Sequence, residues 1–308
     1  MTAASLSTRK SEDAMSDTIL NQDLSEKAPQ RPQMLIAQLL FREKPERCSA
    51  EKARAAMEKY CGDIGETAEK SDILMLPVNG LRVEFKDEPQ GVPPLACFMQ
   101  PAEFTLKLDE MTRSQFWDME NGADFIDGVK YEAIVYAMLS AGLTYREQAE
   151  LFIAQLDAAA EMFPTFEAIF TAGSGKLVPK ARFLEDRQWD KAARFLKTAV
   201  NVRFFTVQGA DEMLVDSLGM YLLALPDVQF HFRALDPNYV VNYAYNLLDY
   251  QYENDFPIED GDRLDGIGAD GNISESVQWR GSYENSLIQP LRLVLDVNCG
   301  EHAAGSRD

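Results

Sequence analysis

The clearest alternation of apolar and polar residues along the chain lies between Val228 and Arg233. Three large apolar side chains alternate there with three polar ones: Val228, Phe230 and Phe232 with Gln229, His231 and Arg233. In a strand, side chains that repeat with a period of two lie on the same face. The pattern therefore predicts a strand with one apolar face against the core and one polar face toward solvent.

A helix is predicted to begin just after this strand, at Asp236-Pro237. The aspartate carboxylate can accept hydrogen bonds from the free N–H groups of a first turn, and proline at the first helical position loses no intrahelical bond. Helical spacing then predicts one buried stripe: Val240, Val241, Ala244, Leu247, Leu248 and Tyr252. Tyr239, Tyr243 and Tyr250 form a second stripe, which would either pack inside the domain or meet a partner.

Apolar runs in the first half of the chain predict four strands, at 34–41, 73–78, 81–85 and 95–99. Ser49 is expected to cap a helix that reaches about Tyr60. Asn79-Gly80 is a strong hairpin signal because both residues tolerate positive φ, so the strands on either side of it are expected to pair. This order of strand, helix, hairpin and strand resembles a ferredoxin-like half.

The middle and the end of the chain alternate between helical and strand patterns. Helices are expected at 112–120, 130–139, 145–163 and 189–198, the third of them stopped by Pro164. Strands are expected at 166–170, 202–207, 212–225, 276–280 and 291–297. Gly219 lies within the third of these strands and predicts a bend or a bulge.

The irregular alternation of strands and helices predicts an α+β protein with mixed, largely antiparallel sheets and packed helices. Two ferredoxin-like halves are one arrangement that fits this order. The length of 308 residues suggests about two domains, which we place at 34–125 and 126–300. Residues 1–33 are expected to form a disordered or loosely docked arm, and residues 301–308 a tail.

Several short motifs in the last third of the chain are similar to those of a known family. They are Leu218-Gly219-Met220, Leu225 to Phe232, Asp236-Pro237, Asn246, Tyr252-Glu253-Asn254, Asp260-Gly261, Trp279 and Asp296-Val297-Asn298. Together they resemble a bacterial family known only as a domain of unknown function, number four-two-six-one. The resemblance implies an α+β module and no particular activity. By analogy it also implies a link to immunity against secreted bacterial toxins, with which related proteins are associated.

The charge of the chain narrows the choice of partner. There are 50 acidic and 30 basic residues, with a formal net charge of −20. Such a surface repels nucleic acid and anionic lipid, which bind through Lys and Arg, and it attracts a basic protein over long range. Solubility alone would also explain an acidic surface.

The sequence also predicts a compartment. It has no apolar run long enough to cross a membrane, and its first residues lack the apolar segment of a signal peptide. The four widely spaced cysteines are expected to be reduced thiols. Together these features predict a cytoplasmic protein.

Three stretches carry residues that catalytic or metal motifs use, and each departs from its motif. Gly173-Ser174-Gly175-Lys176 lacks the first glycine and the Ser or Thr of a phosphate loop, so a tight turn is predicted. The acidic run 255–270 places Leu264 and Asp265 where a calcium hand needs a ligand and a glycine, and Asp-Gly turns explain its composition. His231 and Arg233 are expected on an outward polar strand face. We therefore expect no catalytic residue, no cofactor and no metal.

The same acidic run is the predicted partner surface. Nine acids and two bases lie between Tyr252 and Glu284, and a basic partner would relieve the repulsion among the carboxylates. The candidate partner-binding residues are Glu253, Asp255, Glu259, Asp260, Asp262 and Asp265, together with Tyr239 and Tyr250.

The sequence thus predicts a cytosolic immunity-type binding protein rather than an enzyme. It would neutralise a secreted bacterial toxin by direct binding, for example a nuclease effector of a type VI secretion system. The expected partner is a basic toxin domain, with no binding of nucleic acid or membrane. Two alternatives stay open. One is an enzyme with an unrecognised carboxylate-based site that uses Asp260, Asp262 or Glu253, and the other is a structural adaptor protein.

Overall fold

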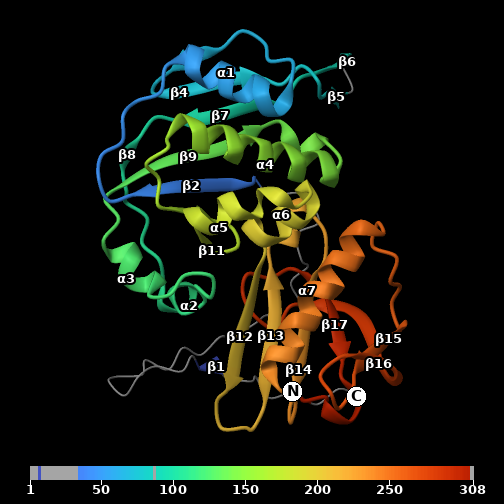
Figure 1. Ribbon diagram of the computed structural model, residues 1–308. Coiled ribbons are helices and arrows are strands. Elements are labelled where there is room, and N and C mark those ends of the chain that lie inside the picture. The colour runs from blue at the N-terminus through green and yellow to red at the C-terminus, as the bar shows by residue number, and fades with distance from the viewer. Residues whose placement is uncertain (1–5, 8–33, 86–87, 306–308) are drawn as a thin grey trace. The chain divides into compact units, whose positions relative to one another are not determined.

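The computed structural model describes residues 6–7, 34–85 and 88–305 (Figure 1). The chain divides into two compact units, one of residues 31–200 and one of residues 201–308 with 1–30. We call them the N-terminal unit and the C-terminal unit. Each contains one large, mostly antiparallel sheet with packed helices, so the predicted α+β class is confirmed. Of the arm expected at 1–33, all but Leu6–Ser7 lies outside the described residues.

The sheet of the N-terminal unit has seven strands in a row. In spatial order they are β11 (Lys176–Pro179), β10 (Ala168–Thr171), β2 (Ile36–Phe41), β9 (Tyr131–Met138), β7 (Leu95–Met99), β4 (Ile73–Pro77) and β3 (Ala68–Lys70). Every neighbouring pair is antiparallel. The short strand β8 (Ala102–Glu103) also pairs with β9, and β5 (Val83–Phe85) pairs with β6 (Glu88–Val92) in a separate ribbon.

Helices cover this sheet on both faces. In Figure 1, α1 (Ala50–Cys61) and α4 (Tyr145–Met162) lie side by side across β9, β7 and β4. Short helices α5 (Lys180–Glu185) and α6 (Lys191–Ala199) pack near β10 and β11. On the other face, a cluster that includes Leu40, Phe116, Phe125 and Phe170 packs the segment of α2 (Glu110–Arg113) and α3 (Gly122–Asp127) against the sheet. Ser49 caps α1 as predicted, since its hydroxyl accepts from the Lys52 N–H at 3.2 Å.

Two predictions for this unit are wrong. The segment expected as a helix at 130–139 is the strand β9, in which buried Ala133, Val135 and Ala137 alternate with more exposed residues, a period of two. In place of the helix expected at 112–120, the structure has the four-residue helix α2, which begins at Glu110 and ends at Arg113.

The predicted hairpin at Asn79-Gly80 is also wrong, although the chain does turn there. Both neighbours of β4 in the sheet are other strands, β3 and β7. The segment after the turn therefore leaves the sheet, and its strand β5 pairs with β6 instead. The main elements follow the order β2, α1, β4, β7, β9, α4, β10. That order contains one strand more than a ferredoxin-like half.

The expected domain boundary between residues 125 and 126 falls inside the N-terminal unit. The reason is that β9 lies between β2 and β7 and pairs with both. The two units meet in sequence between Val200 and Asn201.

The sheet of the C-terminal unit also has seven strands. In spatial order they are β1 (Leu6–Ser7), β12 (Asn201–Val207), β13 (Met213–Leu218), β14 (Asp227–Phe232), β17 (Leu293–Asn298), β16 (Ile273–Asn285) and β15 (Arg263–Ile267). All pairs are antiparallel except β14 with β17. The strand expected at 212–225 ends at Leu218, because Gly219 takes φ 153° and a 3₁₀ turn at Met220–Leu223 follows.

Helix α7 (Pro237–Glu253) packs across β12, β13 and β14 (Figure 1). Its start is as predicted: the Asp236 carboxylate accepts from the Asn238 N–H at 2.8 Å and Pro237 is the first helical residue. The predicted buried stripe is confirmed except for Val241, which is only half-buried. Tyr243 of the second stripe is buried. Its ring packs edge-on against that of Phe230, with 5.7 Å between the ring centroids.

The end of the chain, expected as a tail at 301–308, packs against β14 as far as it is described. Ala303 forms a bridge with Phe232, and the buried Ala304 donates its N–H to the His231 carbonyl at 3.0 Å. Residues 306–308 lie outside the described residues. Within the described part of the chain, none of the helices is long and apolar enough to cross a membrane.

Candidate partner-binding site

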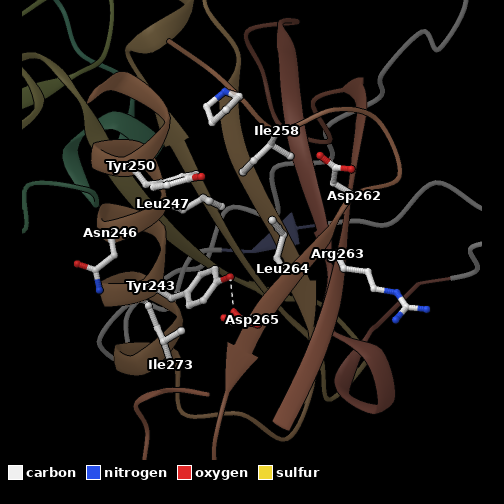
Figure 2. A pocket seen from close by; sticks show the side chains of 11 residues that line it. Tyr243, Asn246, Leu247, Tyr250, Ile258, Asp262, Arg263, Leu264, Asp265 and Ile273 are labelled. Carbon is white, nitrogen blue, oxygen red and sulfur yellow. Dashed lines mark hydrogen bonds between the residues drawn. The ribbon is translucent and has the colours of Figure 1, made fainter. Parts of the chain in front are cut away.

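A pocket of about 480 Å³ opens between α7 and β15 in the C-terminal unit (Figure 2). Its volume lies within the range of about 300–1,000 Å³ that is usual for ligand sites. Three segments line it: the middle and end of α7, the loop at 257–258 and 262, and β15 with Ile273. The first and last of these segments are brought together because β15 forms the edge of the sheet on which α7 packs.

Helix α7 supplies Tyr243, Asn246, Leu247 and Tyr250 to the pocket. Asn246 and Leu247 lie three and four positions after Tyr243, and Tyr250 lies four and three positions after them, so all four share one face of the helix. The Tyr243 hydroxyl donates to the backbone carbonyl of Asp265 at 2.7 Å and fastens β15 to the helix (Figure 2). Burial raises the pKa of this phenol, which therefore stays a hydrogen-bond donor at neutral pH.

Hydrogen bonds hold the loop between α7 and β15 in one shape. The Tyr283 hydroxyl donates to the Ile258 carbonyl at 2.8 Å. Asp260 accepts from the Tyr283 N–H at 2.7 Å, and Asp262 accepts from the Glu259 N–H at 2.8 Å. These two carboxylates each use one oxygen for the loop itself. A loop fixed before binding loses less conformational freedom when a partner arrives.

The predicted acidic residues are all exposed: Glu253, Asp255, Glu259, Asp260, Asp262 and Asp265. The structure places two of them, Asp262 and Asp265, on the lining of the pocket, which Tyr250 also lines. The other four lie at the end of α7 or in the loop that follows. The Asp265 carboxylate also accepts from Gln278 Nε2 at 2.7 Å.

Three large exposed side chains lie on this side of the unit. Tyr239, Tyr250 and Ile273 are 41%, 51% and 53% exposed, and Tyr250 and Ile273 line the pocket. Tyr239 does not. Its ring covers Gly271, where a Cβ atom would lie only 2.4 Å from the ring. The two predicted tyrosines are thus exposed, but only Tyr250 belongs to the pocket.

Sequence reasoning missed Ile258, Leu264 and Ile273, and it assigned Tyr243 no contact with the acidic run. The helical spacing of Tyr243, Leu247 and Tyr250 could have indicated a shared face. The opposite wall could not be foreseen, because it depends on β15 reaching the edge of the sheet.

The polar side chains of β14 are buried, not outward as predicted. His231 Nε2 lies 3.0 Å from the Glu212 carboxylate, and both Gln229 and His231 are buried. Arg233 is exposed as expected.

The turn predicted at Gly173–Lys176 is confirmed: it joins β10 to β11, and Gly175 takes φ 64°. Lys176 Nζ lies 2.5 Å from the Asp118 carboxylate.

A row of polar side chains crosses the sheet on the face opposite α7. Arg203, Asp216, Gln229 and Asp296 lie opposite one another on adjacent strands, and all four are buried. Asp216 accepts from Arg203 at 2.6 and 2.9 Å and also binds Arg292. Gln229 donates to Asp296 at 2.9 Å.

Arg292 extends this network to the segment that covers it. Its guanidinium donates to the carbonyls of Ile288 at 2.8 Å and Pro290 at 2.9 Å, and Nε lies 3.2 Å from Asp227. Arg203 and Arg292 balance the charges of Asp216 and Asp227, so the buried network has a structural role: it fastens residues 286–292 to β13 and β14.

One family model matches part of the chain. Residues 216–298 match the model of the family described as domain of unknown function (DUF4261), in agreement with the resemblance of the motifs. The matched segment contains α7, β15 and every residue that lines the pocket. No curated protein and no solved structure matches the chain.

Proposed function

We propose that the protein is a cytosolic immunity-type binding protein, which neutralises a secreted bacterial toxin by direct binding. A nuclease effector of a type VI secretion system is one such toxin. The observation that carries the proposal is the pocket between α7 and β15, with exposed Tyr250 and Ile273 at its mouth and carboxylates around it. Protein interfaces have this composition, with aromatic anchors at the centre and a polar rim.

The charge of the rim indicates a basic partner. None of the ion pairs between described residues uses Glu259, Asp260, Asp262 or Asp265. These carboxylates can therefore pair with cations of another protein. Attraction of this kind acts over a distance and raises the association rate at low salt. A toxin domain that binds nucleic acid presents the required basic surface.

The first test is protection. The tagged protein is used to capture its partner from the source organism, and the partner is then expressed alone and together with this protein. We expect the partner alone to stop growth and coexpression to restore it. A captured partner whose expression leaves growth unaffected would contradict the immunity role.

The second test concerns the acidic rim. We compare the variant Glu259→Gln, Asp260→Asn, Asp262→Asn with the control variant Glu43→Gln, Glu46→Gln, Glu66→Gln. Both remove three exposed carboxylates, and the amides of the first keep oxygen acceptors for the loop. At low salt we expect the first variant to associate about tenfold more slowly and with a flatter salt dependence, and the control to behave like the parent. Equal rates for both variants would place the interface elsewhere.

A further inference from the structure

The lining of the pocket combines an aromatic ring, aliphatic side chains and acidic residues. In Figure 2 the ring of Tyr250 is directed toward Ile258 and Leu264, whereas the guanidinium of Arg263 is directed away from them. The walls are thus aromatic and aliphatic, and the acidic residues among the lining are Asp262 and Asp265. The Asp265 carboxylate accepts from Gln278 Nε2, which leaves Asp262 as the carboxylate open to an occupant. Arg263 is the single base among the residues that line the pocket.

The end of α7 adds to this negative character. Leu247 and Tyr250 lie in the last two turns of the helix, which ends at Glu253 and has no basic residue in its last turn. The carbonyl end of a helix carries a partial negative charge, which favours cations within about one turn. Helix, carboxylates and aromatic ring therefore all favour the same kind of occupant.

We propose that this pocket receives one arginine side chain of the basic partner, an inference that rests on the function proposed above. The guanidinium stacks on the face of Tyr250 and pairs with Asp262, since a planar delocalised cation suits both contacts. The methylene groups lie against Leu247, Ile258 and Leu264. A neutral apolar side chain would match the walls and leave the charge of the mouth unused. A lysine ammonium is more strongly hydrated and cannot stack.

The experiment uses the whole protein and two small probes, N-acetyl-arginine amide and N-acetyl-citrulline amide. Citrulline has nearly the shape of arginine and no charge. Methyl and amide NMR shifts are followed during titration at low ionic strength. A ligand of this size is expected to bind with Kd of about 1 mM. We expect arginine to shift the methyl signals of Leu247, Ile258, Leu264 and Ile273, and citrulline to leave them unchanged.

Two variants with matched controls locate the site. Tyr250→Ala removes the stacking wall, and Tyr239→Ala removes an exposed tyrosine of the same helix that does not line the pocket. Asp262→Asn removes a charge from the mouth, and Asp249→Asn removes an exposed charge from α7 outside the pocket. The two pocket variants should each raise Kd for the arginine probe by about fivefold or more, and the two controls should not.

Three outcomes overturn the inference: equal shifts with citrulline, shifts scattered over the acidic surface, or equal loss in pocket and control variants. Its failure is distinct from failure of the proposed function. If the captured partner binds Tyr250→Ala as tightly as the parent, the inference of an arginine site is wrong, but the proposal that this is a binding protein still stands. If the arginine probe binds in the pocket but the captured partner is not toxic, the inference of an arginine site still stands and the immunity role is wrong.

Discussion

The role of an aspartate in the C-terminal unit depends on its burial: a buried one stabilises the fold, and an exposed one is available for binding. Asp216 is fully buried between two arginines, whereas Asp249 and Asp262 are exposed. A buried carboxylate that balances a buried guanidinium is needed for the fold, because the guanidinium has no water to replace its partner. An exposed carboxylate contributes little to stability and is available to another molecule.

This difference predicts the effect of removing one charge at each place. Asp216→Asn keeps the shape of the side chain but leaves Arg203 and Arg292 with one carboxylate fewer. We expect unfolding free energy to fall by about 3–5 kcal/mol, the range for breaking a buried ion pair. Asp249→Asn should change it by less than about 0.5 kcal/mol. Urea unfolding of both variants measures this, and a parent-like midpoint for Asp216→Asn would show that the network does not stabilise the fold.

At the scale of elements, α7 orders the C-terminal unit: it packs on three strands and forms one wall of the pocket. Its start is set by Asp236, whose carboxylate accepts from the Asn238 N–H. Asp236→Ala should lower the unfolding free energy by about 1 kcal/mol, and Asp236→Asn, which can still accept that bond, should lower it far less. The measurement is the urea midpoint. Equal losses for alanine and asparagine would assign the effect to the charge and not to the cap.

Helix α7 and β14 could be predicted because both signals are local. Alternating Val228, Phe230 and Phe232 define the strand, and Asp236-Pro237 defines the helix start. The strand β9 could not, because its alanines fit a helix and only its place between β2 and β7 makes it a strand. Asn79-Gly80 failed for a related reason: the turn is local, but β7 takes the position beside β4.

The candidate site was predicted in part on the same grounds. Its acidic residues and tyrosines are visible as a local enrichment in the sequence, and three of them, Tyr250, Asp262 and Asp265, line the pocket. The apolar wall of Ile258, Leu264 and Ile273 is a product of strand order, which no short stretch of sequence contains. The residue types of the site could be predicted from the sequence, but the pocket that brings them together could not.

At the scale of the whole molecule, the division of the chain decides what can fold alone. Residues 31–200 form one compact unit with its own sheet, and a unit of that size can bury a sufficient core. We expect residues 31–200, produced alone, to unfold in one cooperative urea transition with protected core amides. Residues 34–125 provide the matched comparison. They lack β9, β10 and α4, so β2 and β7 lose the strand between them. We expect this shorter piece to show no cooperative transition. If 34–125 folds cooperatively and 31–200 does not, the chain divides at residue 125 and the strand order given for the N-terminal unit is wrong.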